Sequence, residues 1–329
     1  NTEGDYNVAV GQAALGANTT ANNNTAVGRL ALGSNTTGTS NVAVGTNSLD
    51  ANTAGNNITA VGYNALTANT TASSNVAFGA YVLAANTTGA SNVGLGKSAL
   101  EKNTTAADNT AVGAFSLRCN TTGASNVAVG SASLFANITG GSNAAVGLNS
   151  LTANTTGSSN NAFGSTALDN NTTGSSNTAI GNDALDANTT ASDNVAVGNG
   201  AMFANTTGCQ NTAIGRRALN TNITGDNNVA VGFCALKLNT ADNNTAVGHD
   251  ALKANTTGTQ NSALGHEALA SNTEGNYNVA VGRLALYENT TGTCNVAMGQ
   301  TALENATTAS FNTAVGMRAM LNTTTGNKN

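Results

Sequence analysis

The sequence of 329 residues contains no proline and no tryptophan, and charged residues make up only 8% of it. Such a composition is unusual for a globular enzyme. The formal net charge is −5, and the 11 lysines and arginines are scattered along the chain. Because no basic patch is available to neutralise a phosphate backbone, we expect no nucleic-acid partner.

Long apolar runs are also missing. A segment of roughly 20 apolar residues is needed to span a bilayer, and the runs here are only a few residues long. No signal peptide opens the sequence. We therefore expect a soluble segment without membrane insertion, with any targeting signal outside it.

The four cysteines form no pattern typical of metal binding or disulfide pairing. They occur at four different places in the repeat described below, without any Cys-x-x-Cys pair: Cys119, Cys209, Cys234 and Cys294. The sequence therefore predicts neither a zinc site nor a stacked disulfide framework. No nucleophile with a nearby base can be assigned either, so we expect no catalytic residues, no cofactor, no metal and no enzymatic activity.

Two histidines are the strongest candidates for a functional site in this sequence. His249 and His266 occupy the same place in adjacent repeats and are followed by Asp250 and Glu267. This spacing predicts two neighbouring imidazoles with carboxylates beside them. A functional pair and ordinary surface variation are both compatible with it, and two positions in a long array favour the second.

Forty per cent of the residues are hydrophobic, and they recur at fixed places in a repeated unit. Each unit contains one conserved glycine: Gly11, Gly28, Gly45, Gly62, Gly79, Gly96, Gly113, Gly130, Gly147, Gly164, Gly181, Gly198, Gly215, Gly232, Gly248, Gly265, Gly282, Gly299 and Gly316. The spacing is 17 residues throughout, apart from one step of 16 between Gly232 and Gly248, where the segment 239–243 is a residue short. The chain is thus nineteen copies of N-[T/V]-A-[V/I]-G-x-x-A-L-x-x-N-T-T-G-x-x, and we expect one continuous array over residues 1–329.

Positions within the repeat are numbered here from the conserved glycine, which is position 0. Position −1 is always apolar, as at Val10, Val27 and Val44, and position +4 is leucine except at Met202 and Met320. The stretch from −4 to 0 alternates and is rich in β-branched residues, which is typical of a short strand. We expect positions −3 and −1 to face the core and the leucine column to form a second internal ladder.

Position −2 is alanine in every copy but Gly94. On the expectation above, this column faces outward, and a solvent-facing strand position has no reason to exclude large or charged residues. Either another part of the same coil covers it, or a neighbouring chain approaches closely along the array. The second interpretation predicts that Ala179→Lys weakens association without unfolding the coil.

The turn after the leucine is rich in asparagine and threonine. Asparagine occupies position +7 except at Ala306 and Thr323, and a second asparagine begins the strand at position −4 in all copies but Ile58. We expect both columns to form side-chain amide ladders along the stack. Position +10 is glycine or alanine except at Asp242, which indicates a sharp bend that often needs positive φ.

Fourteen copies also carry the glycosylation pattern Asn-x-Thr, with the asparagine at position +7. The signal is weak, because a repeat that needs asparagine and threonine for its turn generates the pattern automatically. Coils stacked about 4.8 Å apart also leave little room for a glycan on each.

Together these columns predict an all-β fold, a parallel β-solenoid with one coil per repeat and a rod of roughly 90 Å. Segments such as Asn126 to Gly130 and Asn177 to Gly181 resemble the N-S-V-A-I-G core of head repeats in YadA-type trimeric autotransporter adhesins. The longer unit is similar to repeat regions of phage tail-fibre proteins that end in a self-cleaving chaperone domain. The resemblance covers the whole chain, rests on a short motif, and implies a homotrimer of left-handed β-rolls that reaches or grips a cell surface.

The main functional prediction is a rigid structural spacer or adhesive shaft, in a virion tail fibre or an extracellular surface filament. Its expected partners are copies of itself, as a homotrimer or end to end, and cell-surface glycans. The alternative is an ice- or carbohydrate-binding solenoid that uses a flat face of asparagine and threonine. The strands at 7–11 and 312–316 are as regular as those in the middle, so neither end resembles a polar cap and we expect the array to continue or to polymerise.

Overall fold

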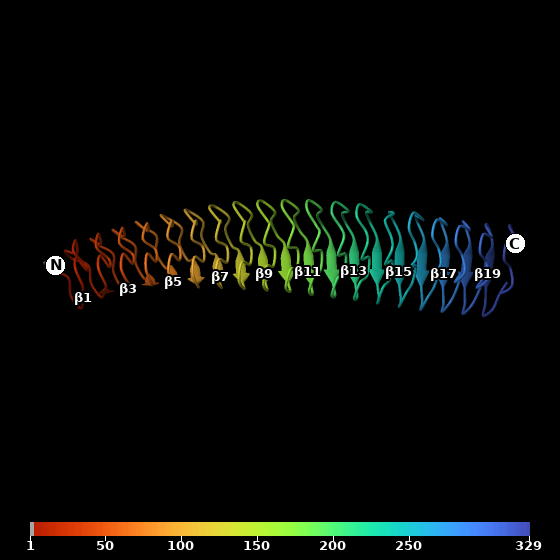
Figure 1. Ribbon diagram of the computed structural model, residues 1–329, viewed down its shortest axis with the longest axis horizontal. Helices are drawn as coiled ribbons and strands as arrows, with labels where there is room; N and C mark the ends of the chain where they lie inside the picture. Colours follow the sequence, from red (N-terminus) through yellow and green to blue (C-terminus); the bar gives the residue numbers. More distant parts are fainter. Residues whose placement is uncertain (1–2) are drawn as a thin grey trace. The chain divides into compact units, whose positions relative to one another are not determined.

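The computed structural model describes residues 3–329, which contain nineteen strands of three residues each and no helix. The chain divides into two compact units, Asn1–Asn160 and Asn161–Asn329. Within each unit the strands lie side by side in chain order, one per repeat (Figure 1). The predicted all-β solenoid with a repeat of 17 residues is therefore confirmed.

The first unit contains β1 (Val8–Val10), β2 (Thr25–Val27), β3 (Val42–Val44), β4 (Thr59–Val61), β5 (Val76–Phe78), β6 (Val93–Leu95), β7 (Thr110–Val112), β8 (Val127–Val129) and β9 (Ala144–Val146). The second contains β10 (Asn161–Phe163), β11 (Thr178–Ile180), β12 (Val195–Val197), β13 (Thr212–Ile214), β14 (Val229–Val231), β15 (Thr245–Val247), β16 (Ser262–Leu264), β17 (Val279–Val281), β18 (Val296–Met298) and β19 (Thr313–Val315).

Consecutive strands of a unit pair in parallel, and equivalent positions face each other. In the pair β2 and β3, for example, Ala26 lies opposite Ala43 and Val27 opposite Val44. Each column of the repeat is therefore a continuous row of like residues along the stack.

The two faces of the strand are the reverse of the prediction. Position −2 is buried: Ala26, Ala43 and their equivalents from β2 onward are 0–2% exposed in the single chain. Val10 is 57% exposed, and Val27 and Val44 are half-exposed, so positions −3 and −1 face outward. The alanine column is therefore covered by its own coil, and Ala179→Lys would place a charge inside the solenoid.

A narrow interior explains the reversal. The alanines of position −2 share the core with the small residues of position +3 and with the leucines of position +4, which are buried as predicted. Two of the serines that replace alanine at +3 bond strand carbonyls: Ser48 Oγ donates to Ala60 O at 2.8 Å and Ser133 Oγ to Ala145 O at 3.0 Å. Ser116 Oγ donates instead to Gly113 O of its own turn at 2.9 Å. Only small side chains from the strand fit into this space, so the larger valine and isoleucine point away from it.

The buried leucines have an uncommon backbone conformation. Leu185 has φ of 52° and Met202 has φ of 50°, both in the left-handed region, and the whole column behaves in the same way. Residues with a branched Cβ are disfavoured there, although Thr166 and Thr301 at position +2 adopt this conformation. This explains why the column contains leucine and methionine but neither valine nor isoleucine, a restriction that volume alone does not impose.

The conserved glycine is required for two reasons. At Gly181, φ is 131°, a conformation that residues with a side chain rarely adopt. A Cβ built on Gly181 would also lie 2.7 Å from the carbonyl oxygen of Gly198 in the next coil. Any other residue would therefore push adjacent coils apart.

The asparagines at position +7 form the predicted amide ladder inside the coil. Asn52 Nδ2 donates to Asn35 Oδ1 of the preceding coil at 2.8 Å and to Gly55 O of its own coil at 3.1 Å. Asn69 continues the row by donating to Asn52 Oδ1 at 3.0 Å. These side chains are 0% exposed, so the Asn-x-Thr patterns of the regular coils offer no free amide for glycosylation in the folded chain.

The asparagines at position −4 link coils mainly through the backbone. Asn24 Oδ1 accepts the backbone N–H of Asn41 at 3.0 Å, and Asn24 Nδ2 donates to Gly38 O at 2.9 Å. The predicted side-chain to side-chain bonds occur in this column only in some coils, for example from Asn126 Nδ2 to Asn109 Oδ1 at 3.2 Å.

The prediction of positive φ at position +10 is wrong. Gly38 and its equivalents have no positive φ. Positive φ occurs at the glycine of position 0 and, in other residue types, at positions +2, +4 and +12, as at Asn47, Leu49 and Ser40. Position +10 is instead restricted because it is buried and because a Cβ on Gly38 would meet Asn35 Oδ1 and Gly55 O, which leaves room only for a small residue. Its carbonyl accepts from two asparagines, Asn24 and Asn35, both at 2.9 Å.

The amide ladder has two defects, each with an unsatisfied buried oxygen. Ala306 replaces the asparagine that would donate to Asn289 Oδ1, and in the shortened coil Asn239 Nδ2 bonds Ala241 O at 2.7 Å instead of reaching Asn222 Oδ1. The strands beside the shortened coil stay in register, with Val229 opposite Thr245. The missing residue is thus absorbed in the turn and not in the sheet.

Candidate assembly face

The outward surface of the strands is the most distinctive exposed feature of the molecule. It consists of positions −3 and −1, which we call the assembly face. Neither column contains a charged residue, and position −1 is apolar in all nineteen copies.

Exposure along position −1 is substantial in both units. The most exposed side chains of this column in the first unit are Val10 (57%), Phe78 (52%), Leu95 (45%) and Val129 (36%). Those in the second unit are Phe163 (42%), Ile180 (43%), Ile214 (42%), Leu264 (51%), Met298 (43%) and Val315 (68%).

A row of this kind has a physical consequence. Single exposed apolar residues are normal on a protein surface, but contiguous apolar stripes usually mark an interaction surface. Because the strands are rigidly paired, the side chains of the stripe cannot withdraw from water by rearrangement. The assembly face of each unit is therefore a preformed apolar surface, with half-exposed or exposed threonines at position −3 as its main polar component.

Charged side chains lie elsewhere on the coil. Arg118 Nε donates to Glu101 Oε2 of the preceding coil at 2.8 Å, both at position +5. Burial opposes ionisation of Glu101, but hydrogen bonds from Arg118 and Ser98 outweigh it, and the pKa of Glu101 is lowered. The same guanidinium lies over the rings of Phe115 and Phe135.

The structure places the two histidines as the sequence predicts. The rings of His249 and His266 stack with centroids 5.1 Å apart, and Phe233 stacks on His249 at the same distance. Each Nδ1 lies 3.5–3.6 Å from the carboxylate of the following residue, Asp250 or Glu267. The row is a surface stack, and no third ligand for a metal joins it within residues 3–329.

The cysteines are separate from one another. All four are free thiols; Cys234 is buried and Cys119, Cys209 and Cys294 are half-buried. In the part of the chain that the structure describes, no helix has the length and apolar character needed to cross a bilayer.

Comparison of the sequence with protein-family models found no match, and comparison with curated proteins found no relative. A function is therefore inferred from the geometry of the coil and from the composition of its outward columns.

Sequence reasoning missed the assembly face because it assigned these columns to the core. One signal could have revealed it. Position −1 admits valine, phenylalanine, leucine, isoleucine and methionine, whose volumes differ widely, and a tightly packed core column rarely tolerates such variation. The position −2 column, limited to alanine and one glycine, has the narrow tolerance expected of an interior.

Proposed function

We propose that this chain is a structural, non-enzymatic segment of a fibre, such as a virion tail fibre or an extracellular surface filament. In this proposal, copies of the chain associate laterally through their assembly faces, as a homotrimer. The observation that carries the proposal is the uncharged apolar stripe at position −1.

A second copy of the chain is the partner best matched to this stripe. The side chains recur once per coil, at the spacing of adjacent strands, about 4.8 Å. A partner that packs side chains between them along many coils needs the same axial repeat. A parallel copy in register has it by construction, and association of identical chains through an apolar surface is common.

The amide ladders support the mechanical part of the proposal. Within each unit, consecutive regular coils are bonded by strand pairs, by asparagine side chains and, in most coils, by threonine hydroxyls, such as Thr36 Oγ1, which donates to Thr53 O at 3.0 Å. Stacking of identical bonds gives stiffness without a large core, which is what a spacer requires.

The alternative of a flat ice- or carbohydrate-binding face loses its asparagine component, because those side chains are buried. Its threonine component stays a prediction. A thermal-hysteresis measurement on the chain tests it, and activity there would favour the alternative over a purely structural role.

The test of lateral association compares two matched double variants. Ile180→Lys with Ile214→Lys places charges on the assembly face, whereas Thr190→Lys with Thr224→Lys places the same charges on exposed positions of the turn. By sedimentation velocity we expect the native chain and the turn variant to be trimeric and the face variant to dissociate with its β-structure retained. A native chain that stays monomeric at high concentration would rule out the assembly.

A further inference from the structure

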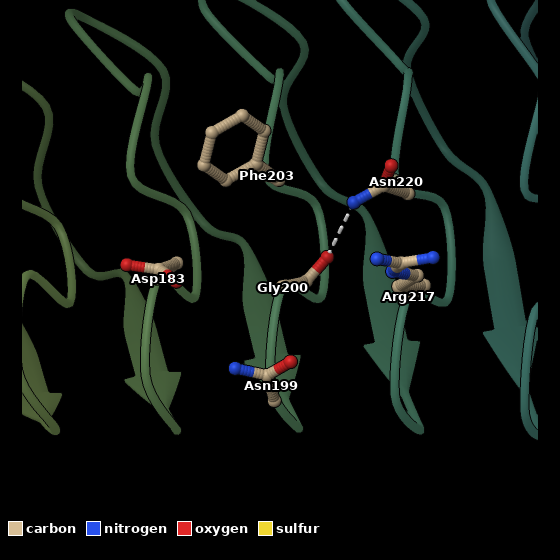
Figure 2. Close-up of a pocket in the computed structure, with 6 residues that line it drawn as sticks. All are labelled: Asp183, Asn199, Gly200, Phe203, Arg217 and Asn220. Atoms are coloured by element: carbon tan, nitrogen blue, oxygen red, sulfur yellow. Dashed lines mark hydrogen bonds between the residues drawn. The ribbon is translucent and has the colours of Figure 1, made fainter.

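One coil of the second unit lacks a side chain that all other coils possess. Position +2 is left-handed in each copy, and Gly200 (φ 62°) is the only glycine at this position. A Cβ at Gly200 would meet only Asn220 Nδ2 at 3.6 Å and Arg217 Cγ at 3.8 Å. The missing side chain leaves a hollow of about 290 Å³ (Figure 2), lined by Asp183, Asn199, Gly200, Phe203, Arg217 and Asn220.

The hollow has opposite charges on its two sides. Asp183 lies at position +2 one coil before Gly200, and Arg217 lies at position +2 one coil after it, so their backbones are two strand spacings, about 10 Å, apart. Asp183 is held in place by Thr166 Oγ1, which donates to its Oδ1 at 2.6 Å, and by Asn182 Nδ2, which donates to its Oδ2 at 2.7 Å. A carboxylate has about four acceptor sites, so it can still bind a cation.

The guanidinium of Arg217 has no hydrogen-bond or ion-pair partner within residues 3–329, although Asp183 lies across the same hollow. The acidic side is reinforced by neighbours: the pKa of Asp186 is raised by burial and by the charges of Asp169 and Asp183. The guanidinium of the adjacent Arg216 lies over the ring of Phe233 in the following coil, so Arg217 is the cation that lines the hollow. The hollow is therefore bipolar along the stack.

Phe203 and Asn220 make the acidic and the basic sides of the hollow chemically different. In Figure 2 the ring of Phe203 lies above Gly200, on the side of the preceding coil that carries Asp183, and Asn220 lies above Arg217. Phe203 is 43% exposed, and Asn220 is fixed by the bond from its Nδ2 to Gly200 O at 2.8 Å. An aromatic ring and a carboxylate that line the same hollow suit an alkylammonium ion. A guanidinium and an amide on its other side suit a phosphate or carboxylate.

We propose that the hollow at Gly200 binds a compact zwitterion with an alkylammonium at one end and a phosphate at the other, of the phosphocholine type. The ammonium lies against Phe203 and Asp183, and the phosphate accepts hydrogen bonds from Arg217. None of the lining residues belongs to positions −3 or −1, so this binding is independent of lateral association through the assembly face.

Titration calorimetry of the full chain with phosphocholine tests the proposal, with choline and inorganic phosphate as ligands that satisfy only one end. A small, open site predicts a Kd on the order of 1 mM for phosphocholine. We expect choline and phosphate each to bind at least about tenfold more weakly. Equal binding of choline, of phosphate and of phosphocholine would overturn the two-ended site.

Two variants locate the binding. Gly200→Asn fills the hollow with a residue that other coils carry at this position in the same conformation, as at Asn47 and Asn64, so the fold is retained and binding is lost. Asn47→Gly is the control, because it opens an equivalent gap between Leu30 and Asn64, which carry no charge, and creates no site. Unchanged affinity of Gly200→Asn, or an equal new site in Asn47→Gly, would contradict the proposal.

A second experiment distinguishes a lipid headgroup from free or glycan-linked phosphocholine as the ligand. Vesicles of phosphatidylcholine sediment with the chain if the hollow accepts a lipid headgroup, and only soluble phosphocholine binds if the group is free or carried on a glycan. Arg217→Gln, which removes an exposed and unpaired guanidinium, abolishes binding in whichever arm is positive; retention there would overturn the role of the phosphate.

Discussion

Val82 occupies the space that a side chain at Gly94 would need. A Cβ built on Gly94 collides with Val82 Cγ1, and both residues are buried. Gly94 is the single exception in the alanine column at position −2, and Val82 is the single valine among the alanines and serines at position +3. The two exceptions therefore compensate, because the larger side chain of Val82 fills the space left by the missing side chain of Gly94.

This compensation predicts strong coupling between the two positions. Gly94→Ala alone overpacks the interior and should cost about 1–3 kcal/mol, while Val82→Ala alone leaves a cavity and should cost a similar amount. The double variant restores the alanine pair of regular coils, such as Ala65 and Ala77, and should be more stable than the sum of the single changes by about 1–3 kcal/mol. Native-state hydrogen exchange of β5 and β6 measures it, and additive effects would show that the contact is unimportant.

The left-handed leucine column predicts an unusual order of tolerance. Leu185→Met should be nearly neutral, since Met202 occupies the next coil in the same conformation. Leu185→Ile keeps volume and polarity but brings a branched Cβ into the left-handed region, and should cost about 2 kcal/mol or more. Thermal unfolding of the two variants decides the point; isoleucine tolerated as well as methionine would show that volume alone sets the column.

The ladder defect at Ala306 predicts a stabilising substitution. Ala306→Asn supplies the donor that Asn289 Oδ1 lacks. It moves the end of the row to the half-exposed coil of Thr323, where water can reach it, so we expect a gain of about 1 kcal/mol. In a regular coil, Asn103→Ala should do the opposite, because it removes the donor to Asn86 Oδ1 and the acceptor for Asn120 Nδ2. Hydrogen exchange near each site provides the comparison, and a destabilising Ala306→Asn would mean that the coil cannot accept the amide.

The raised pKa of Asp186 predicts a pH dependence of stability. Burial and the charges of Asp169 and Asp183 raise the pKa in the folded state, so the folded chain holds this proton more tightly than the unfolded chain. The resulting stability is present below the unfolded pKa and is lost as pH rises through the folded pKa. Asp186→Asn should therefore stabilise the chain at neutral pH, by less than about 1 kcal/mol since the group is half-exposed.

Below pH ~4 the aspartate is protonated and the same substitution should give no gain. Urea unfolding of the native chain and of Asp186→Asn, at neutral pH and below pH ~4, measures the difference in stability. A gain of equal size at low and neutral pH would assign the effect to packing and not to charge.

Much of the coil was predictable from the sequence because stacking turns the chain into its own alignment. Nineteen versions of each position revealed the repeat length, the strand, the buried leucines and the asparagine ladder at position +7. Those features follow from what a column tolerates and from its periodicity alone.

The inside and outside of the strand were not predictable by the same reasoning. Alternation shows that positions −3 and −1 share one face and Ala26 the other, but it does not say which face is inner. The usual rule that large apolar residues face inward fails here, because the interior is too narrow for Val27 and is filled by Leu32 from the opposite side of the coil. The left-handed residues were also hidden, since Leu49 and Ser40 carry no sign of positive φ in their identity.

The shortened coil between Gly232 and Gly248 shows which part of the repeat tolerates a change in length. Its strand keeps register although its turn is a residue short, and in the amide ladder only the hydrogen bond to Asn222 Oδ1 is lost. Length variation at this corner is thus decoupled from the sheet. Insertions there should be tolerated as well, so that short foreign peptides, or naturally diverse loops, could be displayed at regular intervals while the axis of the scaffold is preserved.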